Sequence, residues 1–117
     1  MEWKMNRMVC GSFITAEARR IGNDFAVTVY GGTKIHVGSV SIAGPGHAAV
    51  SMVLPYHMDN VIGEIYANKL TKEFGCNTSV TCGIHYENPT RDDLNNIIHE
   101  SEILLGELIE RIKASER

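Results

Sequence analysis

The chain has 117 residues, of which 44% are apolar and 21% charged, and its formal net charge at pH 7 is −3. These values are ordinary for one folded domain covering residues 1–117 and exclude an intrinsically disordered chain. No basic stripe, membrane-length apolar stretch or signal-peptide core is present, so we expect a cytoplasmic protein that binds neither nucleic acid nor membranes.

The first half of the chain alternates in the manner of β-strands. Phe25, Val27 and Val29 fall on one face of a period-two pattern. Turn signals rich in glycine, such as residues 44–46, separate this segment from its neighbours. The pattern predicts four strands, at about residues 8–19, 25–30, 35–42 and 47–54. Because the turns between them are short, we expect the four strands to form an antiparallel meander.

The second half changes to helical spacing, interrupted by one strand. A helix is expected from Asp59 to Phe74, with Asp59 as its N-cap and Gly75 as its C-terminal stop. Residues 80–84 alternate again and predict a fifth strand. A second helix begins after Thr90, which opens a capping box. Its apolar stripe is expected to pack on the sheet and comprises Leu94, Ile97, Ile98, Ser101, Leu104, Leu105, Leu108 and Ile112.

The order of these elements predicts an α+β fold, in which an antiparallel sheet packs against two helices. The order is four strands, a helix, a strand and a helix. The helices are expected to cover one face of the sheet. The other face would carry a mixture of polar and apolar residues, namely Ala26, Thr28, Tyr30, His36, Gly38 and Val40. An uncovered face of this kind favours a homodimer with a site near its interface.

Two segments are candidate anion sites. Residues 31–34, Gly-Gly-Thr-Lys, offer backbone N–H groups, a hydroxyl and a cation, although a plain hairpin turn also explains them. Residues 57–60, His-Met-Asp-Asn, open a helix whose free N–H groups attract anions, although simple capping is the alternative. His36 and His85 each share a strand face with a glycine, a pattern that marks close approach of a ligand or of another backbone segment.

The sequence contains no complete catalytic motif and no diagnostic metal motif. Imidazole and carboxylate groups suit several divalent ions, but the spacings of the candidates are not diagnostic; these candidates are His36, His57, Asp59 and His85. No nucleophile or base occurs in a recognised motif. The three cysteines, at positions 10, 76 and 82, match neither a disulfide framework nor a zinc site. We therefore expect a protein that is not an enzyme and holds no metal.

Three segments resemble, in the same order, the motifs of one protein family. Residues 31–40 read GGTKIHVGSV, against the family's GGTxxHxGxV. Residues 56–60 read YHMDN, against GHKD followed by an acidic residue. Residues 82–88 read CGIHYEN, against GIHx followed by an acidic residue. The family is the small accessory protein found with gallate decarboxylase and related hydroxyaryl-acid decarboxylases, and the resemblance extends from about Phe25 to the C-terminus.

This resemblance implies a fold similar to that of the proteasome assembly chaperones, and a homodimer. It also implies a function. The family is a chaperone for reduced prenylated flavin mononucleotide (FMN), which it binds without using it catalytically and passes to an apo-decarboxylase. The expected cofactor-binding residues are those that match the family motifs, together with Lys34: Gly31, Gly32, Thr33, Lys34, His36, His57, Asp59, Gly83 and His85.

Met58 stands where the family tends to have lysine, and Lys34 is the expected replacement for the missing positive charge. Two other functions stay open. The first is an assembly or interaction chaperone that has this fold and no cofactor. The second is a small metal-binding protein or part of an enzyme that acts on aryl acids.

Overall fold

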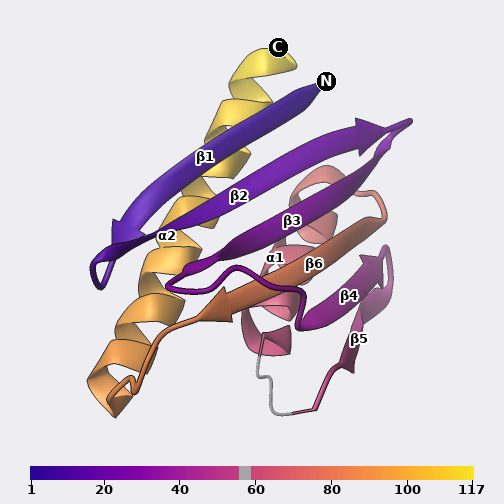
Figure 1. Ribbon diagram of the computed structural model, residues 1–117. Coiled ribbons are helices and arrows are strands. Elements are labelled where there is room, and N and C mark those ends of the chain that lie inside the picture. Colours follow the sequence, from indigo (N-terminus) through magenta and orange to yellow (C-terminus); the bar gives the residue numbers. More distant parts are fainter. Residues whose placement is uncertain (56–58) are drawn as a thin grey trace.

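The computed structural model describes residues 1–55 and 59–117, which form one sheet with two helices packed against it (Figure 1). Its strands are Glu2–Val9 (β1), Ser12–Ile21 (β2), Asp24–Gly32 (β3), Ser39–Gly44 (β4), His47–Val53 (β5) and Thr78–His85 (β6). The helices are Asn60–Phe74 (α1) and Arg91–Ser115 (α2). The strand order is β1-β2-β3-β6-β4-β5, and every neighbouring pair is antiparallel except β3 and β6. The predicted α+β class, a mainly antiparallel sheet against two helices, is confirmed.

Strand β1 is an addition to the predicted elements, so five strands precede α1 and the prediction of four was wrong. Trp3 and Val9 of this strand are buried in the core. Arg7 lies on the same side of the strand as Trp3 and Val9, and it interrupts the alternation of apolar and polar residues. The alternation therefore does not identify this segment as a strand. The hairpin to β2 turns at Cys10 and Gly11, both with positive φ, as a tight two-residue hairpin requires.

The predicted meander was also wrong. Strand β6 lies between β3 and β4 and pairs in parallel with β3. The chain therefore crosses the end of β6 on its way from β3 to β4, and β4 begins only at Ser39. His36 and Gly38, expected on the open face of a strand, lie in this crossing connection instead. Alternation assigns side chains to faces but does not specify which strands are neighbours, because pairing depends on contacts distant in sequence.

Both helices agree with the sequence analysis. Gly75 ends α1 in the left-handed region at φ 64°, and Thr90 and Asp93 form both hydrogen bonds of the capping box of α2. The predicted stripe of α2 is buried from Ile97 onward, apart from Ile98, which is half-buried. Leu94 departs further from the prediction, since it remains 48% exposed. The first turn of α2 faces a pocket at this position rather than the sheet.

The helices divide the sheet between them. Helix α1 packs on β4, β5 and β6, whereas α2 packs on β1 and β2 and contacts α1. The largest fully buried side chains of this layer include Ile14, Tyr66, Leu70, Leu104, Leu108 and Ile112. The opposite face stays open, and on β4 and β5 it carries exposed apolar side chains: Val40, Ile42, Val50 and Met52. Within the described residues, neither helix combines the length and apolar character needed to cross a membrane.

Candidate functional site

The crossing connection, residues 33–38, lies directly on the end of β6. The backbone N–H of Thr33 donates to the carbonyl of His85 at 2.7 Å, and that of Gly38 donates to the carbonyl of Cys82 at 2.9 Å. A side chain at Gly83 would collide with the backbone carbonyl of His36. The two segments therefore approach each other so closely that only glycine fits at position 83. The sequence analysis explained the glycine beside each histidine by close approach of a ligand or of another backbone segment. At Gly83 the structure supports the second explanation.

Asp59 joins the three segments that the sequence analysis singled out. Its side chain is 6% exposed; Oδ1 accepts a hydrogen bond from the backbone N–H of Ile84 at 2.8 Å, and Oδ2 lies 3.0 Å from Nε2 of His36. The predicted N-cap position is correct, but the carboxylate makes no capping bond to α1. It occupies instead the space that a side chain at Gly38 would need. The carboxylate thus fastens the start of α1 to β6 and to the crossing connection.

His36 and His85 lie next to each other at this junction. Their ring centroids are 6.4 Å apart in an edge-to-face arrangement. Nδ1 of His36 lies 3.3 Å from the carbonyl oxygen of Lys34, while its Nε2 faces Asp59. Both ring nitrogens of His36 therefore face oxygen acceptors. Nε2 of His85 lies 3.1 Å from Oε1 of Glu87 at the protein surface.

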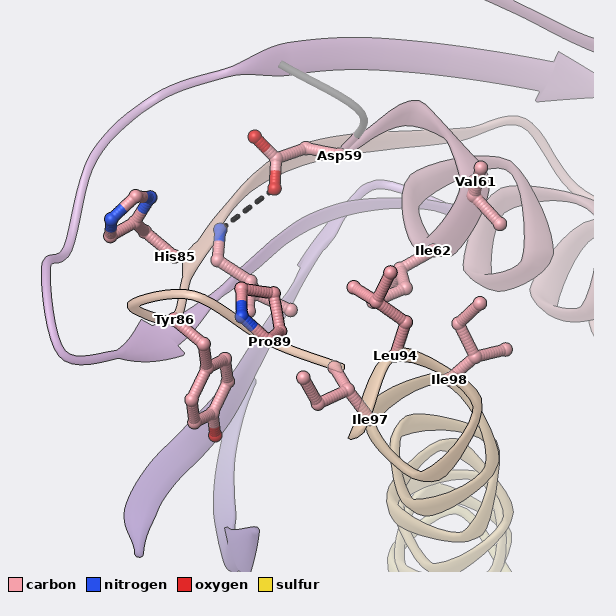
Figure 2. Close-up of a pocket in the computed structure, with 10 residues that line it drawn as sticks. Asp59, Val61, Ile62, His85, Tyr86, Pro89, Leu94, Ile97 and Ile98 are labelled. Atoms are coloured by element: carbon pink, nitrogen blue, oxygen red, sulfur yellow. Dashed lines mark hydrogen bonds between the residues drawn. The ribbon is translucent and has the colours of Figure 1, made fainter. Parts of the chain in front are cut away.

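A pocket of about 300 Å³ opens beside this junction (Figure 2). It lies between the first turns of the two helices, the end of β6 and the segment that follows β6. Asp59 and His85 contribute its polar groups. The rest of the lining is apolar or aromatic and consists of Val61, Ile62, Ile84, Tyr86, Pro89, Leu94, Ile97 and Ile98. A mostly apolar cavity with a few converging polar groups is the usual form of a small-molecule site.

Tyr86 fixes one wall of the pocket. Its hydroxyl donates to the carbonyl oxygen of Val9 at 2.6 Å and so ties the end of β6 to the β1–β2 hairpin. Burial raises the pKa of the Tyr86 phenol to about 12, with a smaller contribution from the nearby thiol of Cys10. The phenol therefore keeps its proton, and this hydrogen bond with it, throughout the physiological pH range.

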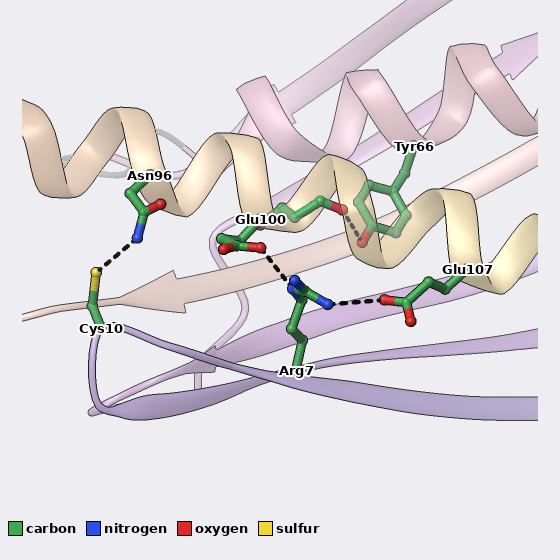
Figure 3. A network of polar contacts seen from close by, with 7 residues as sticks. Arg7, Cys10, Tyr66, Asn96, Glu100 and Glu107 are labelled. Atoms are coloured by element: carbon green, nitrogen blue, oxygen red, sulfur yellow. Dashed lines mark hydrogen bonds and ion pairs between the residues drawn. The ribbon is translucent and has the colours of Figure 1, made fainter.

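Polar contacts hold α2 in place against β1 and α1 (Figure 3). Nε of Arg7 on β1 donates to Glu100 at 2.6 Å, and its Nη1 donates to Glu107 at 3.2 Å. The buried hydroxyl of Tyr66 on α1 donates to the backbone carbonyl of Ser101 on α2 at 2.7 Å. These bonds set the position of α2 against both β1 and α1, and hence the width of the opening between the two helix starts.

The structure brings most of the predicted site residues together. Gly31 and Gly32 end β3 opposite Ile84 and His85, and Thr33 follows them on the crossing connection. Lys34 lies exposed in the same connection. The remaining described residues of the predicted set, His36, Asp59, Gly83 and His85, converge where the connection meets β6. His57 lies outside the described residues.

The sequence analysis missed the apolar lining of the pocket. Leu94 was assigned to the stripe that packs on the sheet, because helical spacing does not distinguish a core position from a pocket wall. The presence of a large aliphatic residue in the first turn of each helix was the available signal. Among the described residues, no group of three or more His, Cys, Asp or Glu side chains is arranged to hold a metal ion.

The chain is similar to known proteins in both sequence and fold. The sequence model of the prenylated flavin chaperone LpdD-like domain matches residues 10–113. The chain is 25% identical over 99 residues to Protein LpdD of Lactiplantibacillus plantarum, an alignment that covers 80% of this chain and 73% of that protein. It is similar in fold to a chain in the crystal structure of a chaperone complex for yeast 20S proteasome assembly. That match has a TM-score of 0.57 and 14% identity, and it covers 97% of this chain and 96% of the other. The family match spans nearly the whole chain, which therefore belongs to the LpdD-like family of prenylated flavin chaperones.

Proposed function

We propose that this prenylated flavin chaperone binds reduced prenylated FMN and delivers it to an apo-decarboxylase of the hydroxyaryl-acid, gallate-type class. In this proposal the protein is cytoplasmic and non-catalytic, and the cofactor is cargo. The observation that carries the proposal is the convergence of three segments distant in sequence at one junction, which lies beside the pocket. The crossing connection, Asp59 at the start of α1, and the end of β6 all meet there.

The residues at this junction suit the parts of a flavin nucleotide. The exposed crossing connection offers a cation at Lys34 and a hydroxyl at Thr33 for the phosphate. The imidazole of His85 lines the pocket and offers a hydrogen bond to polar atoms of the ring system or the ribityl chain. His36, whose ring nitrogens face Lys34 and Asp59, positions the crossing connection. Gly32 and Gly83 act by permitting the close backbone packing where the connection meets β6, and Gly31 permits the close approach of β2 to β3. His57 belongs to the proposed set through its family motif alone.

An anaerobic titration tests cofactor binding. Reduced prenylated FMN is titrated into the purified protein, with reduced FMN as the reference ligand. We expect tight binding of the prenylated cofactor, and about a tenfold loss in Lys34→Ala because a phosphate contact from a charged donor is removed. Lys72→Ala is the matched control. Lys72 is also an exposed lysine, but it lies in the last turn of α1, whereas the first turn of α1 lines the pocket. Absence of binding to the parent protein would refute the proposal.

A transfer assay tests delivery. The loaded protein is mixed under anaerobic conditions with an apo-decarboxylase of the gallate type, and decarboxylation is compared with that after addition of the free cofactor. Faster or more complete activation by the loaded protein supports delivery. Equal activation by the free cofactor means that the protein stores the cofactor but does not hand it over.

A second function, an assembly chaperone that acts without a cofactor, is favoured by a separate observation. The open face of β4 and β5 carries Val40, Ile42, Val50 and Met52, all exposed. Contiguous exposed apolar side chains mark protein interfaces. The solved structure of similar fold belongs to a chaperone complex. In either function we propose that this face forms a homodimer.

Analytical ultracentrifugation at micromolar concentration measures this association. We expect a dimer that dissociates in Val50→Glu, because the substitution introduces a charge into the apolar face. A monomeric parent protein would contradict the homodimer and leave the face for another partner.

A further inference from the structure

The pocket has two chemically different sides. Figure 2 shows the Asp59 carboxylate and the His85 ring on one side, and the aliphatic side chains from the two helix starts gathered on the other. The polar side belongs to the junction that the sequence motifs form. The apolar side belongs to no motif and was found only in the structure.

Two aliphatic side chains of the apolar side are unusually exposed for helices that pack on a sheet. Val61 in α1 is 39% exposed and Leu94 in α2 is 48% exposed. Ile62, directly after Val61, and Ile97, one turn after Leu94, are buried. Exposing aliphatic surface to water is unfavourable in proportion to its area. The pocket thus presents a hydrocarbon-binding surface immediately beside polar groups.

The size of the pocket limits what it can take. Its volume of about 300 Å³ is at the lower end of the range of about 300–1,000 Å³ for ligand pockets. It therefore accommodates one part of a flavin nucleotide and leaves the remainder outside. The part that matches an aliphatic lining is the branched hydrocarbon that distinguishes prenylated flavin from plain flavin.

We propose that Val61 and Leu94 bind the prenyl-derived portion of the cofactor and determine selectivity for prenylated FMN over FMN. This inference rests on the proposed function. The polar atoms of the flavin then face the side formed by Asp59 and His85, where hydrogen-bonding groups replace water. FMN, which lacks the prenyl group, leaves the apolar side of the pocket unfilled and gains no binding free energy from it.

The test substitutes polar side chains of similar size at the two positions, Leu94→Asn and Val61→Thr. Because both side chains are partly exposed, the substitutions spare the buried core. Ile21→Asn is the control: Ile21 is 57% exposed at the end of β2, beside the start of β3, and it belongs neither to the pocket lining nor to the apolar face of β4 and β5. Each variant is titrated anaerobically with reduced prenylated FMN and with reduced FMN, and its melting temperature is recorded.

The expected result is a loss of about tenfold or more in affinity for prenylated FMN in Leu94→Asn, since apolar groups in such pockets discriminate by about 10–200-fold. Affinity for FMN stays the same, and the control keeps both affinities. Equal losses for both ligands, or no loss, would overturn the inference while leaving cofactor binding by the parent protein intact. Failure of the parent protein to bind prenylated FMN would overturn the proposed function, and this inference with it.

Discussion

Replacing Asp59 tests the junction on which the candidate site depends. The carboxylate accepts one hydrogen bond from the backbone of Ile84 and pairs with His36, and it is almost fully buried. Hydrogen bonds to charged groups contribute about 1.5–3 kcal/mol each, and a buried donor left without a partner costs about 1–3 kcal/mol. Ile84 lines the pocket, so water can reach part of this region and lower the cost. We therefore expect Asp59→Ala to reduce the free energy of unfolding by about 2–4 kcal/mol.

Asp59→Asn separates the hydrogen bonds from the charge. The amide oxygen can still accept from the N–H of Ile84, and the amide NH₂ can donate to an unprotonated Nε2 of His36. We expect this variant to lose less than about half as much stability as Asp59→Ala. Glu102→Ala is the control, since Glu102 is exposed on α2, and a change within about 0.5 kcal/mol is expected there.

Urea unfolding of these variants at neutral pH measures the changes, with the m value checked for constancy. A cycle with His36→Ala and the double variant isolates the interaction between the two side chains, for which we expect a coupling of about 0.5–3 kcal/mol. If Asp59→Ala loses no more stability than Glu102→Ala, the carboxylate does not hold the crossing connection. The role assigned to Asp59 at the junction would then be wrong.

Three further predictions concern the rest of the molecule. Leu105→Ala removes a side chain that is almost fully buried in α2 and should cost about 2–5 kcal/mol in urea unfolding; a negligible cost would mean that the packing face of α2 is misplaced. The guanidinium of Arg20 holds the pKa of Glu116 below its ordinary value of 4.5, so this pair stabilises the protein above about pH 4.5, and its contribution is lost as the pH falls through the lowered pKa. Thermal unfolding should therefore separate the parent protein from Glu116→Gln at pH 7, and the gap should shrink as the pH falls below 4.5; a gap that does not change with pH would exclude this pair as its cause. Only Cys10 is an exposed thiol, so a thiol reagent at pH 8 should modify one cysteine quickly, and fast modification of all three would contradict the burial that raises the pKa of the other two, Cys76 and Cys82.

Local sequence was sufficient for the features that depend on neighbouring residues. The capping box at Thr90, the left-handed stop at Gly75 and the buried face of α2 from Ile97 onward are all confirmed, because each arises within one helix. The alternation of Phe25, Val27 and Val29 likewise identified the buried face of β3. The motif residues could also be identified from the sequence, because each motif lies within one short continuous segment.

Features that depend on distant pairing could not be predicted in this way. Strand β1 was missed because Arg7, on the core-facing side, is compensated only by Glu100 and Glu107 of a helix near the other end of the chain. The position of β6 between β3 and β4 follows from pairing across the whole sheet and is invisible to periodicity.

The sequence by itself determined the α+β class, the two helices with their caps, and most of the residues that meet at the candidate site. Only the tertiary structure decided that the connection before β4 crosses the end of β6, which brings His36 within hydrogen-bonding distance of Asp59. Only the structure also revealed that Leu94 lines a pocket. The physical reason is the same in both cases. Helical spacing and strand alternation follow from the geometry of one backbone segment, whereas a crossing and a pocket arise from several segments that the chain brings together only on folding.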